Sequence, residues 1–197
     1  MTLVNTPELQ TERLILRKFN ENDLEALYQI FSDQEVNTYL PWFPLKSLAE
    51  AKSFMKERYL NAYNQPLGYM YAICLKSDNI PIGYIHVSND DSHDFGYGLL
   101  KQYWHQGIVS EASQAVIEQL KKDHISYITA THDIKNVHSG GVMKKCGMTY
   151  QYSYKELWQP KNIWVTFRMY QLNLDGHKER VYQKYWQIYP HFIETEE

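Results

Sequence analysis

The stretch from Phe95 to Lys122 constrains the fold most, because its apolar spacing changes from that of a strand to that of a helix. Phe95 to Leu99 has the composition and length of a short strand. Apolar residues then recur at helical spacing, at Val109, Ala112, Val116 and Leu120. Gly107 stands between the two patterns, where a missing side chain permits close approach of the backbone to a ligand. The sequence therefore predicts a strand, a glycine-containing loop and a helix in direct succession.

A loop of this kind presents free backbone N–H groups and the positive end of a helix dipole to an anion. Ser110 and Glu111 open the predicted helix. On its own, one glycine is weak evidence, because an ordinary left-handed or close-packing glycine explains it equally well. The loop has no glycine-lysine-serine/threonine run and the chain has no GxGxxG, so Walker A and dinucleotide motifs are excluded.

The remaining strand and helix patterns follow an irregular order. Lys76-Ser77-Asp78-Asn79 is a turn-forming cluster that predicts an antiparallel hairpin, and Ser47 and Glu50 have capping-box spacing at a helix start. We expect strands at 14–17, 70–75, 82–87, 95–99, 127–131, 149–154 and 164–172, with helices after 20–23, after 47, over 109–122 and around 142–146. This order predicts a mixed α/β sheet and excludes a regular βαβ repeat.

Bulk properties narrow the class of protein. A chain of 197 residues suits one domain plus an extension. The net charge of −3 gives no electrostatic signal for nucleic acid or anionic membrane. No signal peptide and no apolar run of ~18 residues is visible, so we expect a cytoplasmic protein without a membrane span. Cys74 and Cys146 suit buried free thiols, and no histidine has metal-ligand spacing, so we predict no metal.

Several segments together resemble one family. Phe95-Gly96-Tyr97 with Leu99, followed by residues 103–112, is similar to the acetyl-CoA-binding motif of GNAT acetyltransferases. Asn136 and Ser139, followed by Val142, Lys145 and Gly147-Met148, resemble the second motif of the branch that acetylates ribosomal-protein N-termini. Residues 12–17 and Leu40-Pro41-Trp42 also match that branch. The resemblance covers roughly 7–174 and implies a GNAT fold, a mixed, mostly antiparallel sheet flanked by helices. Residues 175–197 lie outside it, and their aromatic residues in a charged frame predict an appended helix.

The resemblance implies acetyl-CoA as co-substrate and a set of residues that hold it. Backbone N–H groups from Gln106 to Ser110 are expected at the pyrophosphate, and the strand ending at Leu99 at the pantetheine amides. Trp104 fills a slot usually taken by Gln or Arg, and Val109 replaces the usual small residue, which predicts weaker binding or a reshaped loop. Lys145 matches a neighbour of the adenosine phosphates, although a solvated helix lysine is an equal alternative. The expected set is Leu99, Trp104, His105, Gln106, Gly107, Ile108, Val109, Ser110, Asn136 and Lys145.

The catalytic candidates also come from the resemblance. Ser139 matches a hydroxyl that faces the coenzyme sulfur, although Ser is equally favoured as a helix N-cap. Asp94 directly precedes Phe95, where related enzymes place a carboxylate that removes the amine proton through water; an exposed turn aspartate is the alternative. His86 is the second candidate base, against the simpler interpretation of a core histidine.

The acceptor is expected to be a primary amine, either a protein N-terminus or a small molecule such as a polyamine, amino sugar or antibiotic. A protein α-amine has a pKa of ~8 and lysine ~10.4, so weak base candidates favour the α-amine. Trp42, Phe43, His86 and Tyr97 are the expected acceptor-side residues. Asp90, Asp91 and Asp94 suit either a cationic acceptor or a solvated turn.

Two further alternatives stay open. The departure at Val109 and the absence of an unmistakable base leave a non-catalytic acyl-CoA-binding module as a third function. The aromatic residues of 175–197 suit a tail that packs on its own sheet, or one that crosses to a second subunit in a homodimer.

Overall fold

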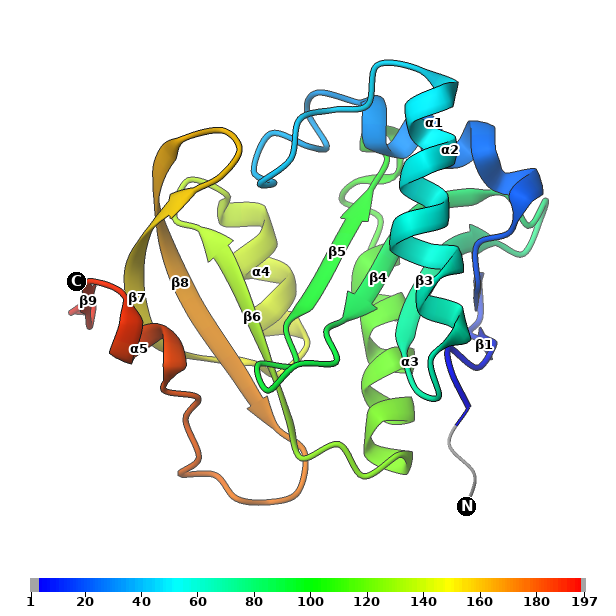
Figure 1. The fold of residues 1–197 in the computed structure, drawn as a ribbon. Helices are drawn as coiled ribbons and strands as arrows, with labels where there is room; N and C mark the ends of the chain where they lie inside the picture. Colours follow the sequence, from blue (N-terminus) through cyan, green and yellow to red (C-terminus); the bar gives the residue numbers. More distant parts are fainter. Residues whose placement is uncertain (1–3, 196–197) are drawn as a thin grey trace.

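Two β-sheets lie side by side and diverge from a common base (Figure 1). The computed structural model describes residues 4–195. The first sheet has the order β1 (Leu9–Gln10), β2 (Leu14–Arg17), β3 (Tyr69–Leu75), β4 (Pro81–Val87) and β5 (Phe95–Leu99). The second has the order β6 (Tyr127–Asp133), β8 (Ile163–Asn173), β7 (Thr149–Trp158) and β9 (His191–Phe192). Within each sheet all neighbouring strands are antiparallel.

The two sheets meet between β5 and β6. In the described part of the chain, the ladder contact between these strands is one parallel bridge, from Asp94 to Thr129. The N–H of Thr129 donates to the carbonyl of His93 at 3.3 Å at the same point. Beyond it β5 and β6 separate, as Figure 1 shows. The separation leaves one edge of β5 without a strand partner, and this edge is the main feature of the candidate site.

Helices cover the two faces of the first sheet. Helices α1 (Leu24–Ser32) and α2 (Leu48–Met55), the latter continued by a π-helical turn at Lys56–Leu60, pack on one face with Ala72 and Tyr84. Helices α3 (Ile108–Lys122) and α4 (Val137–Lys145) pack on the other, with Ile85 and Val87. Because side chains alternate along a strand, Tyr84 and Ile85 of the same strand enter different cores.

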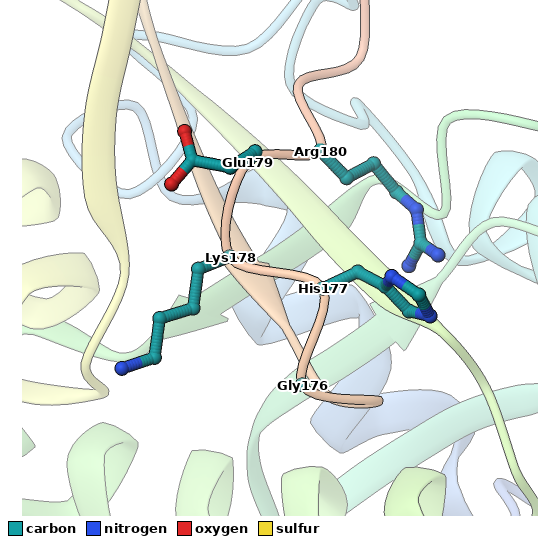
Figure 2. A pocket seen from close by; sticks show the side chains of 5 residues that line it. All are labelled: Gly176, His177, Lys178, Glu179 and Arg180. Carbon is teal, nitrogen blue, oxygen red and sulfur yellow. The ribbon is translucent and has the colours of Figure 1, made fainter.

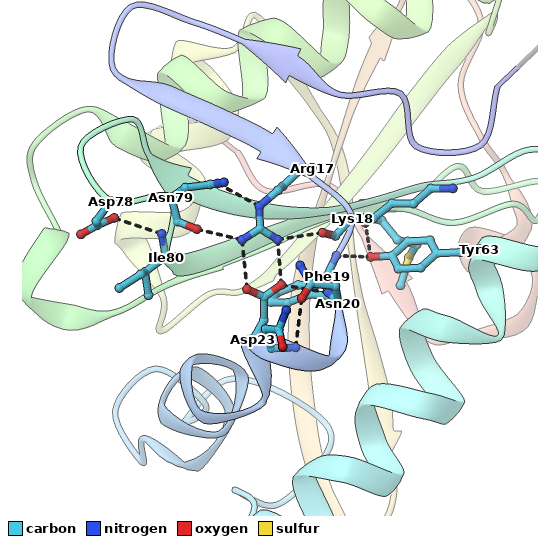
Figure 3. A network of polar contacts seen from close by, with 11 residues as sticks. Arg17, Lys18, Phe19, Asn20, Asp23, Tyr63, Asp78, Asn79 and Ile80 are labelled. Atoms are coloured by element: carbon cyan, nitrogen blue, oxygen red, sulfur yellow. Dashed lines mark hydrogen bonds and ion pairs between the residues drawn. The ribbon is translucent and has the colours of Figure 1, made fainter.

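A polar network fixes α1 against the first sheet (Figure 3). Arg17, at the end of β2, donates to both carboxylate oxygens of Asp23 at 2.7 and 2.9 Å. Its remaining donors reach the side chain and the carbonyl of Asn79, in the β3–β4 turn, at 2.9 and 2.8 Å, and the carbonyl of Lys18 at 2.9 Å. Asn20 and Asp23 form a reciprocal capping box on the 3-10 turn Glu21–Asp23 that leads into α1. The network thereby sets the position of α1, which packs with α2 on one face of the first sheet.

The structure follows the predicted element order, with differences at the ends. Strands β6, β7 and β8 are two to four residues longer than predicted. The β6–β8 and β7–β8 ladders continue past the apolar residues into polar positions. Ser47 caps α2 by accepting from the N–H of Glu50 at 3.2 Å. The Glu50 carboxylate accepts from the N–H of Lys46 at 2.8 Å and not from the N–H of the N-cap Ser47, as it would in a standard capping box.

The C-terminal segment differs most from the prediction. Helix α5 spans only Lys184–Ile188, and the two-residue β9 pairs with β7, so the segment is mainly irregular and not the expected appended helix. Its aromatic residues pack on the second sheet: Tyr185 and Tyr189 stack on Tyr154 with ring centroids 5.0 and 5.2 Å apart. This packing follows the first of the two interpretations of the tail. The domain boundary at 174 and the homodimer stay predictions.

Candidate active site

The free edge of β5 presents unpaired backbone groups to the gap between the sheets. The N–H of Leu100 donates to the carbonyl of Ile82 at 2.9 Å, and the N–H of Ser88 donates to the carbonyl of Asp94 at 2.9 Å. Backbone groups of an antiparallel strand point to alternate sides, so those of Tyr97 and Leu99 point away from β4, towards the gap. The Leu99 carbonyl accepts from the Trp104 indole, which leaves the Leu99 N–H and both groups of Tyr97 for a ligand. This edge can therefore pair with the amides of an extended ligand, and Leu100 is excluded as a donor to it.

The loop between β5 and α3 is held in an unusual backbone conformation. The Trp104 indole donates to the carbonyl of Leu99 at 2.7 Å, which fixes the start of the loop on the end of β5. His105 and Gly107 both have positive φ, at 60° and 74°. A residue with a Cβ is strained at such φ values, so glycine is the favoured residue at the N-cap of α3. Trp104 therefore positions the loop, which the sequence did not predict.

Helix α3 begins with free donors. Its first helical bond runs from the N–H of Glu111 to the carbonyl of Gly107 at 3.0 Å. The N–H groups of Ile108, Val109 and Ser110 precede it and have no partner within the helix. Together with the positive end of the helix dipole, they form a site suited to a phosphate.

A salt bridge braces this helix start against the opening strand. Arg13 Nε donates to Glu111 at 2.6 Å, and Arg13 Nη1 donates to the carbonyl of Gln106 at 3.0 Å. Thr11 and the N–H of Arg13 also donate to the Glu111 carboxylate. Burial alone would raise the pKa of Glu111, but these hydrogen bonds lower it below its ordinary value. Arg13 and Glu111 both lie in segments that resemble the GNAT family, but no sequence pattern predicted that they form an ion pair.

Helix α4 faces the same gap. Asn136 is its N-cap, and the Asn136 side chain accepts from the N–H of Ser139 at 3.3 Å. Ser139 is consequently not the cap, which removes the alternative to its predicted role. The Ser139 Oγ lies 2.9 Å from the hydroxyl of Tyr97 on β5. The ring of His138 lies edge-on to that of His105, with 5.0 Å between centroids. The first turn of α4 therefore contacts the loop that precedes α3.

One predicted cofactor residue, Lys145, lies apart from the loop before α3 and the first turn of α4. Lys145 is exposed in the last turn of α4, and eight residues of helix separate it from Val137, about 12 Å along the axis. The solvated-lysine interpretation fits this position better. Val109 is partly buried against the core next to α3, so its larger side chain points into protein.

Asp94 lies at the base of the gap and is not the exposed turn aspartate of the alternative interpretation. Its N–H donates to Ser88 Oγ at 2.8 Å, which holds the residue at the start of β5. Burial, and secondly the charge of Asp90, raise the pKa of Asp94 from 3.8 to about 7. Burial also raises the pKa of Tyr185, and the Asp94 charge adds to that effect, so the tail lies beside this carboxylate.

The other two acidic residues of the turn have structural partners. Asp90 accepts from Ser88 and Ser92, and Asp91 accepts from Tyr182 and Lys184 of the C-terminal segment. Of the three carboxylates considered for a cationic acceptor, Asp94 is therefore the one whose side chain has no such partner in the described chain.

His86 lies on the same face of the first sheet as Asp94. Its imidazole covers Gly96, where an added Cβ would come within 2.3 Å of the ring. Burial, and secondly the positive charge of Arg58, lower the pKa of His86 to about 3. The ring is neutral at physiological pH and binds a proton too weakly to compete with Asp94 as the base.

The acceptor-side aromatics behave differently from each other. Trp42 packs on Phe31 and Phe54 and donates from its indole to Asn37 at 3.2 Å, whereas Phe43 is 57% exposed. Lys161, in the β7–β8 turn, donates to the carbonyls of Asn37 and Thr38 at 3.3 and 3.2 Å. This contact joins the second sheet to the α1–α2 loop, and no pattern in the sequence indicated it.

A surface pocket elsewhere lacks the features of an active site. It is lined by five consecutive residues of the loop after β8, Gly176 to Arg180, and Figure 2 shows Lys178 and Glu179 pointing away from His177 and Arg180. Arg180 forms a salt bridge to Asp175 at 2.7 Å. Across residues 4–195, no group of three or more His, Cys, Asp or Glu side chains is placed to hold a metal, and no helix is long and apolar enough to cross a membrane.

Comparison with known proteins decides the family. The model of the acetyltransferase (GNAT) domain matches residues 13–149. The chain belongs to the GNAT acetyltransferase family. It is 30% identical to the uncharacterized N-acetyltransferase YnaD of Bacillus subtilis over 161 residues, 79% of this chain and 91% of that protein.

Solved structures confirm the GNAT fold. A GNAT-family acetyltransferase from Bacillus anthracis is 25% identical, with a TM-score of 0.74 over 86% of this chain and 99% of that one. RimL, a ribosomal alpha-N-protein acetyltransferase solved with coenzyme A, is 20% identical, with a TM-score of 0.75 and the same two coverages. This GNAT chain is accordingly an acetyl-CoA-dependent acetyltransferase. The free β5 edge and the start of α3 fit the amides and the phosphates of that co-substrate.

Proposed function

We propose that this acetyltransferase acts on the α-amine of a peptide or protein N-terminus, by direct attack in a ternary complex. The observation that carries the proposal is Asp94, a half-buried carboxylate with a pKa of about 7 at the base of the gap between β5 and β6. A base of that strength suits an α-amine of pKa ~8, whereas a lysine-type amine of ~10.4 costs about 3 kcal/mol more to deprotonate.

Acetyl-CoA supplies the activated acetyl group as a thioester. Asp94 accepts one proton from the acceptor ammonium, directly or through water, so that the free amine can form the new C–N bond as the C–S bond breaks. The second proton then passes from the acetylated nitrogen to the departing thiolate, which leaves as the CoA thiol. The N–H groups of Tyr97 and Leu99 at the free β5 edge are candidate donors to the carbonyl oxygen as it gains negative charge.

Ser139 is assigned to the leaving sulfur. Tyr97 donates its only hydroxyl proton to the Ser139 carbonyl at 2.8 Å. The Ser139 hydroxyl, 2.9 Å away, then donates its own proton to the Tyr97 oxygen in the free enzyme, and rotation about its C–O bond redirects that proton to a thiolate. A serine hydroxyl is too weak an acid to give that proton up, so its role is a hydrogen bond that lowers the charge on sulfur.

Structural relatives support this acceptor class. RimL is described as an alpha-N-protein acetyltransferase, and a ribosomal-protein alanine acetyltransferase from Vibrio fischeri has a TM-score of 0.71 over 86% of this chain. At 20% identity each, these relatives give a reason to test peptide N-termini first.

The test is release of free CoA from acetyl-CoA with matched acceptors. The panel contains a peptide with a free N-terminus, the same sequence Nα-blocked but carrying a lysine, spermidine, and an amino sugar. We expect kcat/KM at least 10-fold higher for the free N-terminus, with mass spectrometry locating the acetyl group on the α-nitrogen. A faster reaction with spermidine or the sugar contradicts the proposal. Binding of acetyl-CoA with neither transfer nor slow hydrolysis would indicate the non-catalytic module.

A further inference from the structure

Arg58 is a half-buried arginine on the face of the first sheet that α1 and α2 cover, and the proposed chemistry does not use it. It lies in the π-helical turn Lys56–Leu60 that continues α2. Its guanidinium carbon lies 4.7 Å from the ring centroid of Trp42 and 5.7 Å from that of Phe54. Stacking on an aromatic face holds the planar guanidinium in one orientation and leaves its N–H edge available.

This arginine lacks the partners that enclosed charges normally have. Its Nε is buried without a hydrogen-bond partner within the described chain, and the polar side chain beside it is the neutral Tyr59, whose ring centroid lies 5.9 Å from the guanidinium carbon. None of the salt bridges formed by residues 4–195 includes Arg58. The Nδ1 of His86 is likewise buried without a partner. Partly buried charges and buried polar groups are usually paired, so two unpartnered groups on one face indicate a missing anion.

Arg58 lies along the same face as the candidate base. On that face, the rings of Tyr84 and His86 cover Gly98 and Gly96, and Asp94 follows two residues further along β5. Ring contacts connect Arg58 to these residues. The ring of Phe31 lies 6.3 Å from that of Trp42, which Arg58 covers, and 4.9 Å from that of Tyr84, and the rings of Tyr84 and His86 are 6.1 Å apart. Asp94 and Gly96 are about 7 Å apart along the strand. An acceptor with its amine at Asp94 can therefore extend past His86 to Arg58.

We propose that Arg58 binds a carboxylate carried by the acceptor, so that the substrate is a short amine-to-acid segment such as an N-terminal peptide with an early acidic side chain. This inference rests on the proposed function. A guanidinium binds a carboxylate through two parallel N–H donors. One guanidinium beside a neutral imidazole balances a single negative charge, which fits a carboxylate better than a dianionic phosphate. Acceptors that carry only positive charge, such as polyamines, leave Arg58 unpaired.

The experiment compares two peptides that differ in one charge, Ser-Asp-Ala-amide and Ser-Asn-Ala-amide, as acceptors for wild type, Arg58→Lys and Arg58→Met. We expect wild type to favour the aspartate peptide by 10-fold or more in kcat/KM. Arg58→Met should reduce that ratio to below 3, mainly through KM, and Arg58→Lys should keep an intermediate ratio. Lys56→Met, which removes an exposed charge from the same turn, should leave the ratio unchanged.

A binding arm separates failure of this inference from failure of the proposed function. The acetylated forms of the two peptides are titrated calorimetrically into each protein in the presence of CoA. Arg58-dependent preference for the aspartate form without any turnover supports the subsite and contradicts the proposed function. Turnover of both peptides with equal kcat/KM in wild type overturns the subsite and leaves the proposed function standing. If Arg58→Met does not fold, the wild-type ratio and the Arg58→Lys variant still decide.

Discussion

The hydroxyl of Tyr97 donates to the carbonyl of Ser139 at 2.8 Å and lies 2.9 Å from its Oγ. This pair ties β5 to the first turn of α4 on the side of the sheet covered by α3 and α4. Tyr97 was expected to contact the acceptor, but its ring packs with the α3 core and its hydroxyl holds the proposed hydrogen-bond donor to sulfur. We therefore propose that Tyr97 positions Ser139.

Removing the Ser139 hydroxyl should slow acetyl transfer without weakening co-substrate binding. We expect Ser139→Ala to lower kcat by about 10- to 100-fold, since a single hydrogen bond to a developing charge is worth about 1.5–3 kcal/mol. Tyr97→Phe should lower kcat by a smaller factor, because the Oγ remains. Calorimetry with acetyl-CoA should give Kd values within 3-fold of wild type for both variants. A normal kcat in Ser139→Ala would remove Ser139 from the mechanism.

Asp94 should set the pH dependence of the rate. A base with a pKa of about 7 must lose its proton to act, so kcat/KM should rise with pH through about 7. Asp94→Asn should lower kcat by about 10²-fold or more and abolish that limb of the profile. An unchanged limb in the Asn variant would assign the ionisation to another group, such as the acceptor amine.

The same carboxylate should cost stability. Its folded pKa, about 7, exceeds its unfolded pKa, so between about pH 4 and 7 the native state binds more protons and the free energy of unfolding falls as pH rises. Asp94→Asn removes this loss. Relative to wild type, we expect the variant to gain roughly 4 kcal/mol between pH 4 and pH 8, as measured by urea denaturation. A difference that does not change with pH would contradict the raised pKa.

The brace between Arg13 and Glu111 should preorganise the loop that holds the phosphates. Glu111→Gln removes the charge that orients Arg13 onto the carbonyl of Gln106, and we expect acetyl-CoA binding to weaken by about 3- to 10-fold, or 0.7–1.4 kcal/mol. Glu118→Gln is the matched control, because Glu118 pairs with Lys121 near the other end of the same helix. If both variants weaken acetyl-CoA binding equally, the effect comes from a less stable α3 and not from the position of the loop.

Lys161 should affect the acceptor and not the co-substrate. Because it joins the β7–β8 turn to the α1–α2 loop, Lys161→Met should raise the acceptor KM by about 3-fold or more while the acetyl-CoA Kd stays constant. Lys155→Met, an exposed lysine on β7, is the control for loss of charge. If Lys161→Met changes the acetyl-CoA Kd and not the acceptor KM, the contact supports the co-substrate site and the prediction is wrong.

Elements with a strong local signal could be predicted from the sequence. The alternation in 82–87, the helical repeat after Val109 and the turn cluster before Ile80 each specify local backbone structure, and β4, β5 and α3 are close to the predictions. The C-terminal segment had aromatic residues but no regular period. Its conformation depends on Tyr154 and Asp91, distant partners that the local sequence does not identify.

The candidate site was predictable where backbone chemistry defines it and less so where distant side chains meet. Gly107 and the donors after it follow from a strand, a loop and a helix in succession. Arg58, Lys161 and the brace at Glu111 depend on contacts between residues 98 or more apart, or on a group left without a partner. The raised pKa of Asp94 depends on how deeply the fold buries it, and sequence carries no local sign of that.

The start of α3 as the acetyl-CoA site is tested most directly by thermal denaturation of wild type, Gly107→Trp and Gly176→Trp, each with and without acetyl-CoA. Both glycines have positive φ, 74° and 86°, so the two variants carry comparable backbone strain, but Gly176 lies in the surface loop after β8. A ligand at ~100 times its Kd adds about 2.7 kcal/mol of stability. We expect that shift in wild type and Gly176→Trp and its loss in folded Gly107→Trp. A full shift in Gly107→Trp would contradict the site.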